Sequence, residues 1–327
     1  MTPEESKSLA LAIKADIEHY DHIVICRHER PDCDAHGAAL GLKAILKANY
    51  PTKDIRYFAK EAVDFAAFLG PEDPEDPNFY KEALCIVVDT ATQERVSSDY
   101  FLESLKVIKI DHHPATDNFG ALNYVDVTMP ACCAILCRLV KLWGYTLPQE
   151  AMKPLYVGMV MDTGRFKYVG TNGEVMTLAG ELIDQGHLDL ESIYADIGLT
   201  DISKVHFSGY VSNHFKQTKH GVNYIVFTKE LREKFNASLD DCSSLVNNMD
   251  SVIGSQIWMI FIETETEVRI SMRSRYISLV ALANKYNGGG HKNACGARIP
   301  SKDDIKKVLK DADEMLKEFH TQHPECK

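Results

Sequence analysis

The stretch HIVICRHERPDCDAHGAALGLKAILKANY, residues 22–50, joins a short apolar run to a helical pattern through a polar connection. HIVICR (22–27) is typical of a buried strand, and the apolar spacing from Gly37 onward indicates a helix. The same alternation continues along the chain, with predicted strands at 54–60, 83–89 and 106–111 and predicted helices at 131–144 and 150–162. Strands that alternate with helices predict an α/β fold built on a doubly wound, mostly parallel sheet.

The length of 327 residues predicts two domains rather than one. The alternating pattern defines a first domain over residues 1–188. The segment 189–205 lacks strong periodicity and is predicted to be a linker. Residues 206–327 carry further strand patterns and a closing polar helix, which together predict a smaller mixed α+β domain.

The chain has a net charge of −11 and is 45% hydrophobic and 25% charged, as is usual for soluble globular proteins. A protein that grips long nucleic acid by its backbone needs a basic face, and the first two-thirds of this sequence contain no Lys/Arg block. We therefore expect either a small ligand or positive charge supplied by bound metal.

The sequence shows no signal-peptide pattern and no apolar run near the roughly 20 residues that a membrane span needs. Nine cysteines occur without any CxxC pair, which argues against a zinc site and favours reduced thiols. These features predict a cytoplasmic protein with no membrane partner.

Polar side chains follow several of the predicted strands, at the point where each strand ends. Because the carboxyl ends of parallel strands form one crevice, we expect these side chains to converge there. A further aspartate follows the apolar run at 150–162 and is expected to join them. The set consists of His28, Asp32, Asp34, Asp89, His112 and Asp162.

Four carboxylates brought together repel one another unless cations hold them. Carboxylates and imidazoles without thiolate suit Mn²⁺ or Mg²⁺ and leave Fe²⁺, Co²⁺ or Zn²⁺ open. The number of ligands indicates two metals with a bridging carboxylate, a device for hydrolysing phosphate esters. An aspartate at a strand end is more often a helix cap or turn former, so the hypothesis depends on the coincidence of the whole set.

Four runs resemble the successive motifs of the DHH phosphoesterase family. They are HERPDCDAHG (28–37), VVDTA around Asp89, DHHP (111–114) and MDTG (161–164). GGGHKNACGA (288–297) and SMRSR (271–275) resemble the C-terminal domain associated with that family. The resemblance covers nearly the whole chain. It is closest to the stand-alone bacterial oligoribonuclease and pAp phosphatase (nanoRNase) branch, which degrades very short RNA and dephosphorylates 3′-phosphoadenosine 5′-phosphate.

This resemblance implies that the six converging residues bind two divalent cations, preferably Mn²⁺, with Mg²⁺ or Co²⁺ as alternatives, and that one aspartate bridges them. It also implies that Asp111 does not bind metal itself but orients an imidazole by hydrogen bonding. His113 would contact the phosphoryl oxygen and protonate the leaving oxygen. The implied reaction is hydrolysis of RNA of a few nucleotides to mononucleotides, and of pAp to AMP, by a bridging hydroxide.

In the second domain, three consecutive glycines allow backbone amides to approach an anion closely. Arginine is the side chain suited to fork onto phosphate. The expected substrate-binding residues are Arg273, Ser274, Arg275, Gly288, Gly289, Gly290 and His291.

The sequence departs from the family where the helix after DHHP begins. Ala131, Cys132 and Cys133 stand where family members often carry hydroxyl residues that cap the helix and contact substrate. Phe166 and Tyr168, after MDTG, are expected either to stack on a base or to pack in the core.

Other functions stay open at this point. A phosphodiesterase for cyclic di-AMP or linear pApA has the same two domains, and a non-catalytic nucleotide sensor differs only in lacking turnover. An inorganic pyrophosphatase shares the first domain, but the GGGH element argues against it because pyrophosphate has no nucleoside for a second grip. The expected partners are short RNA, pAp or other small nucleotides, and a homodimer stays open.

Overall fold

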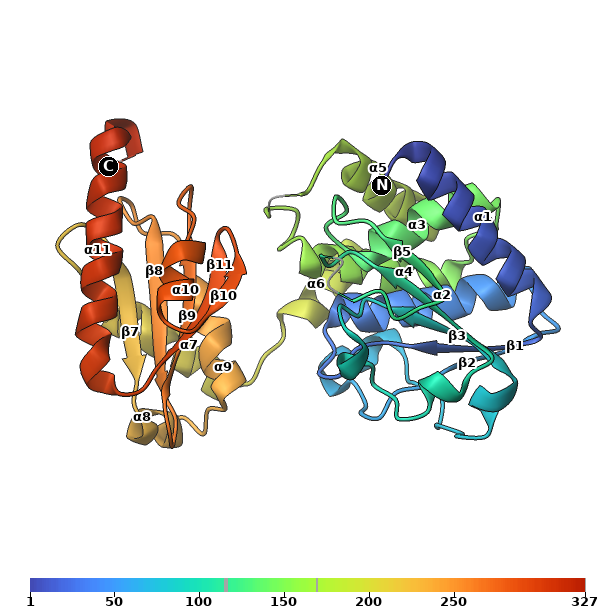
Figure 1. Ribbon diagram of the computed structural model, residues 1–327, viewed down its shortest axis with the longest axis horizontal. Coiled ribbons are helices and arrows are strands. Elements are labelled where there is room, and N and C mark those ends of the chain that lie inside the picture. Colours follow the sequence, from blue (N-terminus) through green and yellow to red (C-terminus); the bar gives the residue numbers. More distant parts are fainter. Residues whose placement is uncertain (115–116, 169, 327) are drawn as a thin grey trace. The chain divides into compact units, whose positions relative to one another are not determined.

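A five-stranded sheet in the order β2-β1-β3-β4-β5 lies at the centre of the first structural unit, Met1–Gly198 (Figure 1). All neighbouring strands in it pair in parallel. The computed structural model describes residues 1–114, 117–168 and 170–326. The strands are β1 His22–Cys26, β2 Asp54–Tyr57, β3 Ala83–Val88, β4 Lys106–Asp111 and β5 Leu122–Val125. The predicted α/β class with a parallel sheet is confirmed.

Both faces of this sheet are buried, and each contributes to its own hydrophobic cluster. In β1, Ile23 and Ile25 join the cluster formed with the long helices, whereas Val24 and Cys26 point into a second cluster. That second cluster is closed by loops and short 3₁₀ turns. The long helices are α1 Pro3–His19, α2 Cys33–Asn49, α3 Cys132–Trp143, α4 Gln149–Asp162, α5 Gly173–Gly186 and α6 Leu190–Gly198.

The helices predicted at 131–144 and 150–162 are confirmed as α3 and α4. α3 ends at Gly144, whose φ of 68° lies in the left-handed region that glycine adopts without strain. We predicted no strand at β5. Its sequence LNYV is short, and Tyr124 is the one fully buried residue in it.

The segment 189–205, which we predicted to be a linker, is largely helical. It contains α6 and the first residues of α7, Ile202–His214. The chain divides between Gly198 and Leu199, inside this segment. Its weak periodicity reflects two short helices rather than irregular backbone.

The second unit, from Leu199 onward, holds a six-stranded sheet in the order β10-β11-β9-β8-β7-β6. Only β7 and β8 pair in parallel, so the predicted mixed α+β domain is confirmed. The strands are β6 Lys216–Gln217, β7 Asn223–Phe227, β8 Ile257–Glu263, β9 Val268–Ser274, β10 Gly289–His291 and β11 Ala294–Ile299. The remaining helices are α8 Lys229–Lys234, α9 Leu239–Ser244, α10 Val280–Lys285 and α11 Ile305–Gln322.

Among the described residues, no helix combines the length and the apolar composition that crossing a membrane requires.

Close packing of α2 against α4 fixes the position of the motif HERPDCDAHG (28–37), whose last residues form the beginning of α2. A Cβ atom on Gly37 would lie 2.4 Å from the carbonyl oxygen of Pro154, a backbone atom that cannot rotate away. We expect Gly37→Ala to lower the free energy of unfolding by about 1–3 kcal/mol through overpacking. Gly180→Ala is the matched control, since no atom lies within 4 Å of its added Cβ, and it should be neutral or slightly stabilising. Urea unfolding of both variants measures the difference, and equal stabilities would contradict this account of the α2–α4 contact.

Candidate metal centre

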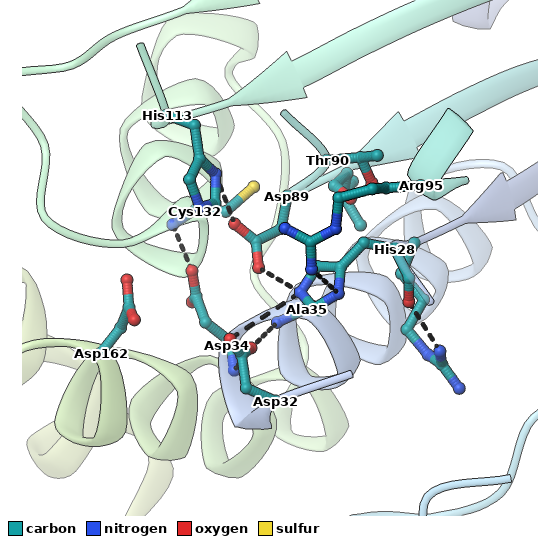
Figure 2. A network of polar contacts seen from close by, with 12 residues as sticks. His28, Asp32, Asp34, Ala35, Asp89, Thr90, Arg95, His113, Cys132 and Asp162 are labelled. Carbon is teal, nitrogen blue, oxygen red and sulfur yellow. Dashed lines mark hydrogen bonds and ion pairs between the residues drawn. The ribbon is translucent and has the colours of Figure 1, made fainter. Parts of the chain in front are cut away.

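A cluster of carboxylates and imidazoles lies at the carboxyl ends of β1, β3 and β4 (Figure 2). His28 follows β1, Asp89 follows β3 and His112 follows β4. Asp34 in the first turn of α2 and Asp162 at the end of α4 complete the arrangement. The parallel strand ends thus bring His28, Asp89 and His112 together, although these residues lie far apart in the sequence.

Asp89 occupies the centre of the cluster and is only 1% exposed. Its Oδ2 lies 3.5 Å from His28 Nε2, and its Oδ1 lies 3.3 Å from His112 Nε2. Oδ1 is buried and accepts no hydrogen bond from the described residues. A buried carboxylate oxygen without a donor is costly unless a cation binds it. The donors present therefore fit a metal at this position, with Asp89 turned toward both imidazoles.

Three groups of side chains could each hold a metal ion, because the ligand atoms within each group lie within 4.8 Å of one another. Every predicted metal ligand belongs to at least one of these groups. The first group shares Asp89 with the second group and His112 with the third, so neighbouring cation positions would share ligands. In that order, the groups are Asp89–His112–His113, His28–Asp32–Asp89 and Asp34–His112–Asp162.

Asp34 holds the beginning of α3 as well as facing the cluster. Its Oδ2 accepts a hydrogen bond from Cys132 N at 2.6 Å, and its Oδ1 accepts one from Cys133 N at 3.0 Å. Ala131, the N-cap residue, provides no side-chain cap. A carboxylate from α2 therefore replaces the hydroxyl cap that this sequence lacks, in a position that the helix dipole favours.

Asp32 is likewise both a helix cap and a candidate ligand. Its Oδ1 accepts hydrogen bonds from Asp34 N at 3.0 Å and Ala35 N at 2.9 Å. Its Oδ2 lies 3.8 Å from His28 Nε2 and is not used by the cap. The capping role that strand-end aspartates often have thus leaves one oxygen available to a metal.

The carboxylates around the two imidazoles favour the protonated form of each ring. Burial alone would lower the pKa of His28, but the neighbouring carboxylates of Asp32 and Asp89 raise it to about 10. For His112 burial again opposes the shift, and Asp89 raises the pKa to about 10. Burial and the charge of Asp34 raise the pKa of Asp162 to about 8. Cations that bind these side chains would therefore compete with protons.

His113 is oriented by a buried polar chain. Its Nδ1 lies 2.8 Å from Asp111 Oδ1, so its Nε2 is the nitrogen left for a substrate. Burial would raise the pKa of Asp111, but the hydrogen bond to His113 lowers it, which keeps the carboxylate ionised. Lys109 Nζ lies 3.2 Å from Asp111 Oδ2 and donates hydrogen bonds to the carbonyls of Ala91 and Asp117.

Our sequence analysis missed Lys109. It is fully buried in β4, two residues before Asp111 and therefore on the same face of the strand. A lysine inside an otherwise apolar run was the signal that could have revealed it.

In the second unit, Arg273 and His291 lie in one row of the sheet. Ala294 of β11 pairs with His291 on one side and with Arg273 on the other. Directly paired residues of adjacent strands project from the same face. Both predicted substrate contacts therefore share that face.

Ser274 and Arg275, two other predicted substrate contacts, form hydrogen bonds to backbone carbonyls of the same unit. Ser274 is buried, and its hydroxyl donates to the carbonyl of Ile277. Arg275 Nη2 donates to the carbonyl of Asp250 at 2.7 Å, with its guanidinium over the ring of Trp258.

The three glycines begin the β10–β11 hairpin. A Cβ on Gly288 would lie 2.0 Å from Gly296 O, and one on Gly290 would lie 2.5 Å from Ala294 O. The amide of Gly288 already donates to Ala283 O. Close strand packing therefore accounts for Gly288 and Gly290, whereas a Cβ on Gly289 would meet only a side-chain oxygen at 3.9 Å.

The two aromatic residues after Asp162 differ. Phe166 packs against the core near Tyr156, with ring centroids 6.4 Å apart. Tyr168 is 51% exposed, and its ring lies over Gly164. Of the two residues, Phe166 packs in the core as one of the expected outcomes, whereas Tyr168 does not.

Two family models match the chain. The DHH family N-terminal domain matches residues 22–161, and the DHHA1 domain matches residues 221–318. The chain is 34% identical over 305 residues to the bifunctional oligoribonuclease and PAP phosphatase NrnA of Bacillus subtilis (strain 168), covering 92% of this chain and 97% of that one. The chain belongs to the DHH family of phosphoesterases.

Further relatives agree with this assignment. The protein of the same name from Mycoplasma genitalium is 34% identical over 310 residues, covering 93% of this chain and 96% of its own length. The crystal structure of an exopolyphosphatase-related protein from Bacteroides fragilis matches 95% of this chain and 98% of that one, with a TM-score of 0.83 and 26% identity. DHH phosphoesterases depend on metal, and the clusters around Asp89 fit that requirement.

Metal binding to this DHH protein should release protons. His28 and His112 must each lose the proton that their raised pKa values retain, so the affinity for Mn²⁺ should weaken as the pH falls from about 9 to about 6. Titration calorimetry in buffers of different ionisation enthalpy counts the protons released. An affinity that does not change with pH would contradict the protonated cluster.

Proposed function

We propose that this chain is a metal-dependent phosphoesterase that hydrolyses RNA of a few nucleotides to mononucleotides and removes the 3′-phosphate of pAp. The observation that carries the proposal is Asp89, a buried carboxylate placed between two imidazoles with one oxygen lacking a hydrogen-bond donor. The substrate class is supported by the activities named for the relatives from B. subtilis and M. genitalium.

The proposed cofactor is a pair of divalent cations, with Mn²⁺ preferred and Mg²⁺ or Co²⁺ as alternatives. Carboxylate oxygens combined with imidazole nitrogens and no thiolate support this choice. Asp89 would be common to both positions, because its two oxygens face His28 and His112. The first position would use His28, Asp32 and Asp89, and the second would use Asp34, Asp89, His112 and Asp162. When bound, such a pair activates water and offsets the charge of the phosphoryl oxygens.

The side chains of the DHHP run handle the leaving group. As water adds to phosphorus and the P–O bond breaks, His113 gives a proton from Nε2 to the departing oxygen. Asp111 orients the ring through Nδ1, and Lys109 fixes Asp111 from the buried side. In the second unit, Arg273, His291 and Gly289 are the proposed substrate contacts. The geometry of Ser274, Arg275, Gly288 and Gly290 supports structural roles for those residues.

His113→Ala should lower kcat on pAp by about 10²–10⁴, because the leaving oxygen loses its acid. Its affinity for Mn²⁺ should stay close to that of the wild type, since the six assigned ligands remain. His112→Ala is the contrasting variant and should lose Mn²⁺ affinity together with activity. His19→Ala, an exposed histidine at the end of α1, is the neutral control. Full activity in His113→Ala would remove the residue from its proposed role.

The substrate assignment is tested by comparing Mn²⁺-dependent rates on pAp, a diribonucleotide, a longer RNA and cyclic di-AMP. We expect pAp and the diribonucleotide to be preferred, and activity to be lost after dialysis against a chelator and restored by Mn²⁺. Faster hydrolysis of cyclic di-AMP would favour the cyclic-dinucleotide alternative. Tight nucleotide binding without turnover would favour the sensor.

A further inference from the structure

Arg95 lies beside the candidate metal centre and has no role in the proposal above. It is the last residue of the 3₁₀ turn Gln93–Arg95, in the loop that follows β3. Its carbonyl accepts a hydrogen bond from Glu29 N at 2.7 Å, and the next residue, Val96, forms an isolated antiparallel bridge with His28. The backbone of Arg95 is thus tied to the loop that carries the first candidate ligand.

The guanidinium of Arg95 contacts the ring of that ligand (Figure 2). Arg95 Nη2 lies 3.3 Å from His28 Nδ1, and the same Nδ1 lies 2.8 Å from the carbonyl oxygen of Glu29. If His28 Nε2 binds a cation, Nδ1 carries the proton and donates it to that carbonyl. Nδ1 then has no lone pair for Arg95. The contact is therefore not a hydrogen bond when the site is loaded.

Nothing else within the described part of the chain pairs with this guanidinium. Three arginines of the first unit, by contrast, lie close to carboxylates: Arg27 lies 3.1 Å from Glu72, Arg56 lies 2.6 Å from Asp54, and Arg138 lies 2.8 Å from Glu174. A guanidinium beside a metal-bound imidazole is repelled by the cation. An anion that lies between the cation and the guanidinium is attracted by both and offsets the repulsion between them.

We propose that Arg95 binds a non-bridging oxygen of the phosphate group that is hydrolysed. This assignment rests on the proposed phosphoesterase function. The planar fork of guanidinium donors matches phosphate oxygens. Its charge offsets the negative charge on those oxygens in the transition state.

Arg95→Ala and Arg95→Lys test the assignment. We expect Arg95→Ala to lower kcat/KM on pAp by about 10²–10³, as for loss of one preorganised donor. Arg95→Lys should recover only part of the rate because an ammonium lacks the fork. Added guanidinium ion should partly rescue Arg95→Ala. Arg56→Ala is the control, because Arg56 lies on β2, is exposed and pairs with Asp54.

Mn²⁺ affinity and phosphate binding give readouts that a merely structural role would not reproduce. Arg95→Ala should bind Mn²⁺ like the wild type, and its Mn²⁺-loaded form should bind inorganic phosphate more weakly in calorimetry. Unchanged kcat/KM, or loss of Mn²⁺ affinity in parallel with activity, would overturn the assignment, the latter making Arg95 a residue that only positions His28.

The phosphate measurement also separates this assignment from the proposed function. If the wild type hydrolyses neither pAp nor a diribonucleotide but Arg95→Ala still weakens phosphate binding, the anion site stands and the proposed function fails. If the wild type is active and Arg95→Ala binds phosphate normally, the assignment of Arg95 fails alone.

Discussion

The crowding of four carboxylates at one edge of the parallel sheet is the constraint on which the rest of the site depends. At its centre, Asp89 is almost completely buried, and its Oδ1 has no hydrogen-bond donor among the described residues. Negative charge at that depth is unfavourable unless positive charge accompanies it. This crowding raises the pKa values of His28, His112 and Asp162, so that protonation is one way to meet the need. Divalent cations meet it with more charge and without protonating the carboxylates, so the fold itself creates the demand for metal.

The carboxylates that surround the centre also hold helix ends in place. Asp32 caps α2, and Asp34 accepts the first amides of α3 through both of its oxygens. These bonds fix the side chains before a cation arrives, which reduces the conformational entropy lost on binding. The small apolar residues at 131–133 follow from the same arrangement, since α3 needs no hydroxyl of its own and buries these residues in the core. Helix capping and ligand positioning are one feature of this fold.

The sequence predicts four of the five strands of the first sheet, and with them the places of His28, Asp89 and His112, for a physical reason. Both faces of the first sheet are buried, so each strand is a continuous apolar run, and the first polar residue after the run marks its carboxyl end. Lys109 lies inside such a run, where a charge conflicts with the strand pattern. Arg95 acts through a long side chain whose direction residue spacing does not encode. The glycine run 288–290 was ambiguous because close strand packing and anion binding both require residues without a Cβ.

An acidic chain that acts on phosphate must concentrate its positive charge. The net charge is −11, and the buried or half-buried Arg27 and Arg138 are paired with carboxylates. Bound cations and Arg95 would place positive charge at the ends of the strands, and salt limits its reach to a Debye length of about 8–10 Å. A nucleotide or a very short RNA fits within that distance, whereas most phosphates of a long strand would lie beyond it. A net charge of −11, with positive charge concentrated at one site, therefore favours the small substrates proposed here.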